Sequence, residues 1–205
     1  MNENRSDKRI GEKIKKVVVA GVRFLGFIGR EEIIIEKEQI KSILPHRKGK
    51  LFLDRVIITA KKITGEFLIT AEACEGHEIG GQPMFRGVDY PEMTAQLLGI
   101  WLARQATQYP QLNERLAPLR KASFKCIGSS IPGDILRVEI PIKERNEEEG
   151  EEGNPRMESV KDEDRLTWSR QQAIVINAEA WVGDKKKAVI YFVELSIVDV
   201  KSLVK

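Results

Sequence analysis

The sequence predicts an α+β fold in which an antiparallel sheet wraps around one long central helix. The first observation is the segment 92–105, which is apolar on nearly every side and so has to be buried in most directions. The second is a series of segments rich in Val, Ile and aromatic residues on both sides of it, which is typical of strands. A sheet that curls around the helix is the natural way to bury it.

Before the central helix, the pattern predicts one short helix and two strands. Residues 37–44 carry apolar residues at helical spacing, and Pro45 ends that helix. Strands follow at 51–59 and 63–73, the second with clear alternation of apolar residues. Residues 1–36 are assigned to an N-terminal extension, partly disordered because its first residues are polar.

The central helix and the strands after it complete the predicted domain. Within the helix, Gly99 costs about 1 kcal/mol relative to alanine and permits a close backbone approach. Further strands are predicted at 121–127, 135–142, 173–182 and 188–198. The acidic segment 143–167 cannot bury enough apolar surface to pack, so it is predicted to be a mobile insertion. Residues 37–205 are therefore expected to form a single domain.

The composition and charge of the chain limit the classes of protein to which it can belong. The chain has 205 residues, of which 41% are hydrophobic and 32% are charged, enough for one full core. The formal net charge is only +3, and no basic cluster suggests nucleic-acid binding. The two cysteines, Cys74 and Cys126, lack metal or redox spacing and are expected to be buried free thiols in a reducing, cytoplasmic environment.

No segment has the roughly 18 apolar residues of a membrane span. The best candidate, residues 17–28, is interrupted by Arg23 and lacks a small-residue cleavage site after it. We expect this part of the extension to pack against the domain. Contact with a membrane surface through its basic amphipathic character is the alternative.

Residues 75–96 hold the side chains best suited to chemistry. His77 precedes a loop rich in glycine and proline, and Glu92 follows at the start of the central helix. An imidazole and a carboxyl group form an acid/base pair, and a helix start stabilises negative charge on a bound carbonyl. These parts fit proton transfer beside a thioester.

Three blocks of residues along the chain form recognisable motifs: Leu44-Pro45-His46-Arg47 with Asp54-Arg55-Val56; Gly76-His77 with Pro83-x-Phe85-x-Gly87-Val88 and Glu92-Met93-x-Ala95-Gln96; and Phe124 with Pro132-Gly133-Asp134. Together these blocks resemble one family, the bacterial 3-hydroxyacyl-acyl-carrier-protein dehydratases. They lie in the family's order and span about residues 39–142, with a weaker match over 170–198.

The resemblance implies a hot-dog fold, in which two protomers pair through an apolar flank and the active sites lie at the dimer interface. A trimer of dimers is a further assembly open to such a protein. It also implies a substrate chain linked through pantetheine to an acyl carrier protein, with no metal and no cofactor.

The resemblance further assigns roles to residues. His77 matches the base that removes the C2 proton of a 3-hydroxyacyl thioester, and Glu92 matches the acid, from the partner protomer, that protonates the departing hydroxyl. Gly87 matches the glycine whose backbone N–H points at the thioester oxygen, and Gln96 matches the glutamine that supports the carboxylate. The acyl tunnel wall would include Met84 and Phe85.

Each of these residues also has a simpler structural interpretation. His77 fits an ordinary loop histidine, and Gly87 fits a turn glycine. The spacing from Asp89 to Glu92 is that of a capping box, so Glu92 could serve the helix end alone. Met84 and Phe85 fit core packing equally well, and His46 is expected to be structural.

The chain departs from the family pattern at three points. One is that Asp89-Tyr90-Pro91, which is more polar, stands where the family has apolar residues before the glutamate. One residue is inserted between His77 and Pro83, which is expected to re-aim His77 and leave the helix start unchanged. Arg86 stands where the family has proline, and a cation beside Glu92 would lower the pKa of that carboxyl group. We therefore predict that Arg86 faces outward and pairs with Asp89, Glu78 or an acidic carrier helix.

The expected function is that of a hydro-lyase of fatty acid biosynthesis, a homodimer that dehydrates a 3-hydroxyacyl thioester on acyl carrier protein. Another hot-dog activity, thioesterase or enoyl-CoA hydratase, is the enzymatic alternative. A non-catalytic acyl-binding or assembly subunit is the alternative from a different class.

Overall fold

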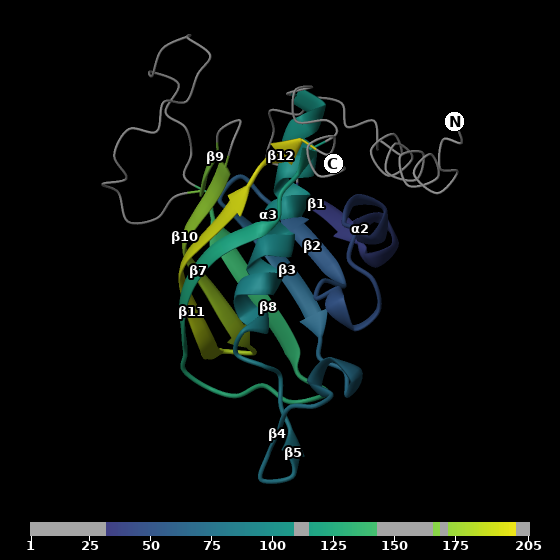
Figure 1. Cartoon of the computed structure of the whole chain (residues 1–205), viewed down its shortest axis with the longest axis vertical. Coiled ribbons are helices and arrows are strands. Elements are labelled where there is room, and N and C mark those ends of the chain that lie inside the picture. The colour runs from purple at the N-terminus through teal and green to yellow at the C-terminus, as the bar shows by residue number, and fades with distance from the viewer. Residues whose placement is uncertain (1–31, 109–114, 143–165, 169–171, 200–205) are drawn as a thin grey trace, which may run out of the picture.

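The computed structural model describes residues 32–108, 115–142, 166–168 and 172–199 (Figure 1). The predicted disorder and membrane contact of the extension fall on residues 1–31, and most of the predicted acidic insertion falls on residues 143–165, so both lie outside the described residues. No helix within the described residues is long and apolar enough to cross a membrane.

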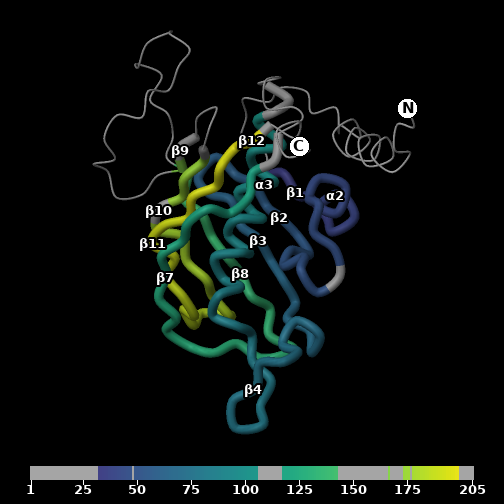
Figure 2. Tube along the Cα trace, viewed as in Figure 1, coloured from purple at the N-terminus to yellow at the C-terminus, as the bar shows by residue number. Residues whose placement is uncertain are grey.

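A large antiparallel sheet forms one layer, with the strand order β1-β2-β3-β8-β10-β11-β7 and β9 paired to β10 beside this path. Its strands curve around α3, which runs along the concave side of the sheet (Figures 1 and 2). The strands are β1 Ile33–Glu36, β2 Arg55–Ile58, β3 Lys62–Leu68, β7 Leu119–Cys126, β8 Ile135–Pro141, β9 Leu166–Trp168, β10 Gln172–Val182 and β11 Lys185–Ser196.

Shorter elements complete the chain. Two small two-stranded sheets lie outside the main sheet: the β4–β5 hairpin, and β6 paired with β12. In the described part of the chain the helices are α2 and α3, with two short 3-10 turns. Their bounds are α2 Lys37–Ile43, η1 Lys48–Lys50, η2 Glu72–Cys74, β4 Glu78–Ile79, β5 Gln82–Pro83, α3 Asp89–Gln108, β6 Arg115–Leu116 and β12 Val198–Asp199.

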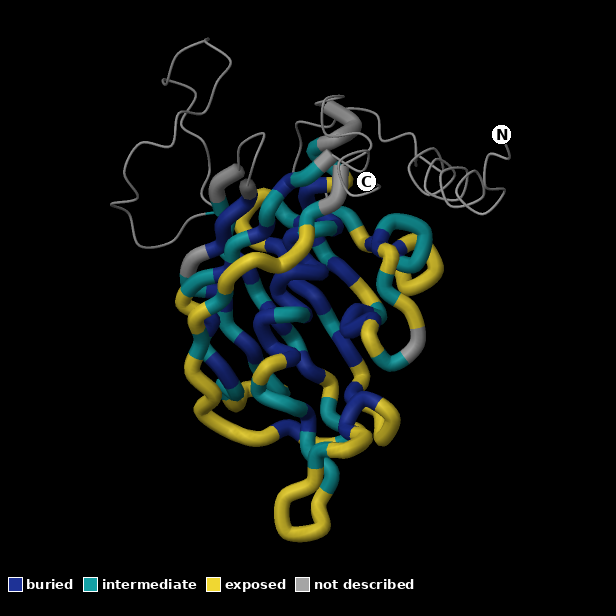
Figure 3. Tube along the Cα trace, viewed as in Figure 1, coloured by how far each residue is buried: buried dark blue, intermediate teal, exposed yellow. Residues whose placement is uncertain are grey.

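The core lies between α3 and the inner face of the sheet. Helix α3 contacts β3, β7, β8, β10 and β11, and its apolar side chains are almost completely buried, as the all-round apolar pattern predicts. Gly99 admits a side chain from the neighbouring loop, because a Cβ there would lie 3.2 Å from Leu44 Cδ2. Figure 3 shows the buried interior and the exposed β4–β5 hairpin.

The predicted antiparallel sheet around a central helix is confirmed. The structure differs from the prediction in segments at the margins of the sheet. Ile33–Glu36, assigned from sequence to the extension, pairs with β2 as strand β1. The strand predicted at 63–73 ends at Leu68, since the Ile69 N–H bonds to Asp134 O and η2 follows. Leu166–Trp168, assigned to the mobile insertion, pairs with β10.

The cysteine prediction is correct for one residue and wrong for the other. Both are free thiols, and Cys74 is buried, but Cys126 is exposed. Cys126 ends strand β7, which is an edge of the sheet. An apolar local sequence does not reveal that a strand lies at an edge, which explains the error.

Candidate active site

Glu92 lies in the first turn of α3 and points into a cluster of polar groups from the preceding chain. Its Oε1 is 3.2 Å from His46 Nε2 and accepts a hydrogen bond from Gln96 Nε2 at 3.0 Å. Gln96 is almost fully buried, one helical turn further along the same face. The same carboxyl oxygen therefore faces an imidazole and an amide.

The orientation of Gln96 is fixed by the chain around residue 50. Its Oε1 accepts the Phe52 N–H at 2.9 Å, and its Nε2 also donates to Lys50 O at 2.8 Å. The amide oxygen is occupied by a backbone donor, so the amide NH₂ is the end left for Glu92. This is the contact that the predicted supporting role of Gln96 requires.

The surroundings of Glu92 favour its charged form. The hydrogen bond with His46 lowers the pKa of the Glu92 carboxyl group most; burial opposes this, and the Gln96 hydrogen bond and the Lys50 charge lower it further. In these surroundings the Glu92 carboxyl group is therefore a better base or hydrogen-bond acceptor than an acid.

The capping interpretation of Glu92 is wrong. Helix α3 begins at Asp89, so Asp89 is already a helical residue, and its N–H bonds to Arg86 O. No hydrogen bond in the described part of the chain joins the Glu92 side chain to the Asp89 backbone. The carboxylate of Glu92 is directed at His46 and Gln96 instead.

His77 lies at the base of the β4–β5 hairpin. Its N–H donates to Cys74 O, and its O accepts the Met84 N–H. The ring Nδ1 is 2.9 Å from Met84 O. A carbonyl only accepts, so Nδ1 carries the hydrogen and the neutral ring keeps its lone pair on Nε2, as a general base requires.

The inserted residue is absorbed within this hairpin. Glu78 pairs with Pro83 and Ile79 with Gln82. The two residues at the turn, Gly80 and Gly81, have φ of 60° and 76°, the conformation of a tight two-residue hairpin turn that glycine adopts without strain. The hairpin therefore closes directly beside His77 and Met84.

Gly87 occupies the turn before α3. A Cβ there would lie 2.7 Å from Cys126 Sγ, so close packing against the end of β7 excludes any side chain. Within the described residues no acceptor takes the Gly87 N–H. That N–H is the donor the predicted oxyanion role needs.

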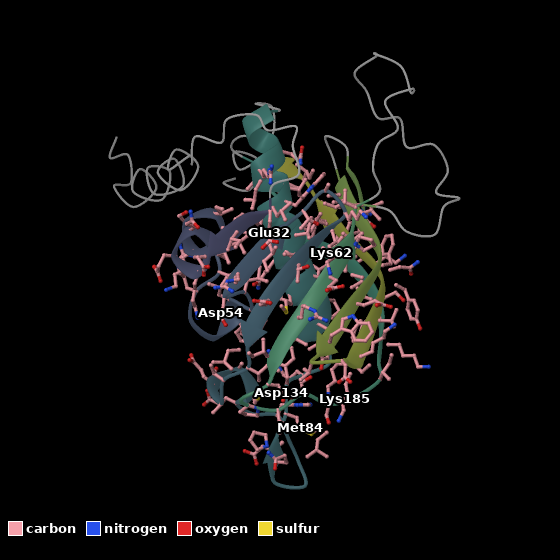
Figure 4. All side chains as sticks on the ribbon, turned by 180° about the vertical axis from the view of Figure 1, so that it is seen from behind. Glu32, Asp54, Lys62, Met84, Asp134 and Lys185 are labelled. Carbon is pink, nitrogen blue, oxygen red and sulfur yellow. The ribbon has the colours of Figure 1, made fainter. Side chains whose placement is uncertain are left out.

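The two predicted tunnel residues differ in environment. Phe85 is buried in an aromatic cluster, with ring centroids 5.5 Å from Phe52 and 5.4 Å from Tyr90. Met84 is half-buried and lies at the end of the molecule that carries the β4–β5 hairpin (Figure 4). The core interpretation fits Phe85, while Met84 borders the His77 loop.

Arg86 pairs with Asp89, as one of the predicted alternatives requires. Arg86 Nε lies 2.7 Å from Asp89 Oδ2 and Arg86 Nη2 lies 2.9 Å from Asp89 Oδ1, a bidentate pair. Its charge is therefore matched locally and is not among the causes of the lowered pKa of Glu92.

Within one chain, the residues assigned from sequence form two groups. Glu92 and Gln96 belong to one and His77 and Met84 to the other, and no hydrogen bond or ion pair among the described residues joins His77 to Glu92. His46, expected to be structural, belongs to the Glu92 group. The only sign of this in the sequence was its place in the first family block.

The described residues contain no cluster of His, Cys, Asp and Glu arranged to hold a metal ion.

Comparisons with known proteins place this geometry in context. No family model matches the chain. The 3-hydroxyacyl-acyl-carrier-protein dehydratase FabZ of Koribacter versatilis is 32% identical over 163 residues, which are 74% of this chain and 83% of that protein. FabZ of Clostridium acetobutylicum is 34% identical over 109 residues, or 51% of this chain and 74% of that protein.

Among solved structures, the dehydratase heterocomplex ApeI:P from Xenorhabdus doucetiae superposes with a TM-score of 0.57 at 12% identity, over 81% of this chain and 97% of that chain. This likeness shows the hot-dog fold. The sequence identity to the two FabZ proteins shows the family. The chain therefore has the hot-dog fold and, by its identity to the FabZ proteins, belongs to the 3-hydroxyacyl-acyl-carrier-protein dehydratase family.

Proposed function

We propose that this chain dehydrates 3-hydroxyacyl thioesters on acyl carrier protein to trans-2-enoyl thioesters, as the names of its relatives indicate for those proteins. The observation that carries the proposal is the tautomer in which the His77 imidazole is held. Its Nδ1 is held by Met84 O, which leaves Nε2 free to remove the C2 proton of a thioester.

The second half of the reaction needs a donor for the departing hydroxyl group. Glu92 is the carboxyl group in the family position, oriented by Gln96 and His46. The Gly87 N–H lies just before the helix start, where the helix dipole also favours negative charge on the thioester oxygen. Stabilising that oxygen makes removal of the weakly acidic C2 proton feasible.

No hydrogen bond or ion pair among the described residues joins His77 to Glu92 within one chain, which fits a homodimer in which each site takes His77 from one protomer and Glu92 from its partner. Strand β7 ends the sheet, and most of its residues are exposed. An edge strand carries backbone groups able to pair with a second copy. Pairing there would bring the Gly87 turn, which packs on Cys126 of β7, to the interface.

Thioester hydrolysis is the second candidate, favoured by one observation. The pKa of Glu92 is lowered, chiefly by the hydrogen bond with His46, and an ionised carboxylate can activate a water molecule. The two functions differ in product: dehydration conserves the thioester and forms a conjugated double bond, whereas hydrolysis releases a free thiol.

Purified protein incubated with 3-hydroxyacyl-acyl carrier protein tests the proposal. We expect the ultraviolet absorption of an enoyl thioester and no release of thiol. His77→Ala should lower turnover by about 10²–10⁴-fold, the usual contribution of a positioned base, and Glu92→Gln should lower it similarly.

The matched control is Glu75→Gln, which changes an exposed carboxylate close to the His77 loop and should leave turnover unchanged. Turnover of His77→Ala within about tenfold of wild type would remove His77 from the mechanism. Thiol release without enoyl product would favour the thioesterase.

A further inference from the structure

The loop between α2 and η1 holds His46 in a defined position. Leu44 caps α2 through its N–H bond to Ile40 O at 2.8 Å and packs on Gly99 of α3. Arg47 Nη1 donates to the carbonyls of Leu44 and His46, each at 2.6 Å. The backbone on both sides of the imidazole is thereby tied to α2 and α3.

The imidazole of His46 makes its polar contact with Glu92. Its Nε2 is 3.2 Å from Glu92 Oε1, whereas Nδ1 is buried and has no hydrogen-bond partner among the described residues. A histidine that only supports a loop would be expected to bond that loop. Among the described residues, the polar contact of the ring is instead to the proposed acid, and the buried Nδ1 is left unpaired.

Three groups around Glu92 stabilise the negative charge of its carboxylate. Gln96 of α3 donates a hydrogen bond, Lys50 of η1 contributes a positive charge, and His46 contributes both kinds of interaction. None of them can return a proton to Glu92 except the imidazole, because an amide does not ionise and a lysine ammonium titrates far above neutral pH. The acid step therefore needs a proton source that Glu92 alone does not provide near neutral pH.

We propose that His46 is a positioning residue that supplies Glu92 with the proton given to the departing hydroxyl, so that the two side chains act as one proton-sharing pair. The inference rests on the proposed dehydratase function. It adds a second histidine to the reaction, with a role distinct from that of His77.

Each turnover comprises the following movements of protons and electron pairs. His77 Nε2 takes the C2 proton, the C2–H electron pair forms the double bond, and the C3–O bond breaks with its pair on oxygen. That oxygen takes the proton of the Glu92 carboxyl group and leaves as water. The Glu92 carboxylate regains a proton from His46, and both histidines then return to their starting states by exchange with solvent.

The first test is the pH dependence of enoyl formation by His46→Gln. Glutamine still donates a hydrogen bond to Glu92 but carries no proton, so the carboxyl group must hold the transferable proton alone. We expect the alkaline limb of the pH–rate profile to move to lower pH by about one unit or more, because carboxyl groups ordinarily titrate below imidazoles. Turnover above that limb should fall at least about tenfold, and the loss should shrink as the pH falls.

Arg47→Gln is the matched control, because it loosens the same loop without touching Glu92. It should lower turnover, if at all, without moving the alkaline limb. An unchanged limb in His46→Gln would overturn the proposal, as would an equal displacement in Arg47→Gln. Should His46→Gln not fold, His46→Asn replaces it.

A second test needs no turnover. The side-chain carboxyl ¹³C signal of Glu92, identified by its absence in Glu92→Gln, is titrated in wild type and in His46→Ala. Removing the imidazole should raise the pKa of Glu92, since the hydrogen bond with His46 is the largest cause of its lowered pKa. An unchanged midpoint overturns the pair. A shifted midpoint without enoyl formation rejects the dehydratase function and leaves the pair established.

Discussion

Asp89 is the charged residue that organises the start of α3. It is the first residue of the helix, its side chain is only 7% exposed, and it accepts both hydrogen bonds of Arg86. A carboxylate in the first turn also interacts favourably with the helix dipole. Because Asp89 takes up the arginine charge, the Glu92 carboxyl group is left to His46 and Gln96.

The Arg86–Asp89 pair should be strongly coupled. We expect Arg86→Ala to destabilise the fold by about 2–4 kcal/mol, since it leaves a buried carboxylate without its partner. A double-mutant cycle with Asp89→Ala, measured by urea unfolding, should give a coupling energy of about 1–3 kcal/mol.

The chain offers a matched control for this cycle in Glu38 and Lys41, also three residues apart but on an exposed surface of α2. That pair should couple by less than about 0.5 kcal/mol. Equal coupling energies at the two sites would show that burial does not govern the Arg86–Asp89 interaction.

Single residues also show what the sequence can and cannot predict. The types and order of His77, Gly87, Glu92 and Gln96 were readable from the motif, and so was the need for a partner for Arg86. The contact of His46 with Glu92 was not, because it joins segments far apart in the chain. The capping-box spacing was misleading because Asp89 lies inside the helix rather than before it.

At the scale of elements, β3 is shaped by close contact with α3. Gly65 lies in the middle of β3, opposite Val56 of β2 and Val138 of β8. A Cβ there would lie 2.6 Å from Leu53 Cδ2 and 3.2 Å from Leu97 Cδ1. Glycine at this position lets the helix and the loop before β2 approach the sheet closely.

Gly65→Ala should therefore destabilise the protein, although alanine ordinarily suits a strand better than glycine. We expect a loss of about 1–3 kcal/mol in the free energy of unfolding from overpacking, measured by urea denaturation. The neighbouring Glu66→Ala changes the outer face, where Arg55 is a distant partner at 4.0 Å, and should stay within about 0.5 kcal/mol of wild type. A neutral Gly65→Ala would mean that Leu53 repacks freely.

Helices and strands were predicted correctly where the apolar periodicity extends over many residues. The predictions failed where tertiary contacts determine where an element begins or ends. The apolar pattern of α3 placed the helix, and the four strands after it were placed to within a few residues. The run from Ile69 onward alternates like a strand, but its backbone turns to bond the loop at Gly133 and Asp134. The strand β1 was missed because four residues at an edge carry little periodic signal.

On the whole molecule, exposed apolar side chains occur near the proposed interface. Val88, beside Gly87, is 63% exposed, and Ile127, directly after β7, is 53% exposed. Lys121 and Lys125 on the same strand would discourage edge pairing in a monomer. Apolar contacts can outweigh the effect of these lysines, because a stable dimer buries about 800 Å² on each partner. The long lysine side chains can meanwhile keep their charged ends in solvent.

Ile127→Lys should therefore dissociate the proposed homodimer without unfolding the protomer, because a single exposed substitution costs a free monomer about 0.5 kcal/mol or less. The matched control is Ile34→Lys, which alters a similarly exposed isoleucine (48%) on β1, at the opposite edge of the sheet. Sedimentation at micromolar concentration should find Ile127→Lys monomeric and both wild type and Ile34→Lys dimeric. The monomer should also lose enoyl formation, because in the proposed dimer each site takes His77 from one protomer and Glu92 from its partner. An active monomer would show instead that one protomer completes the site, and a dimeric Ile127→Lys would place the interface elsewhere.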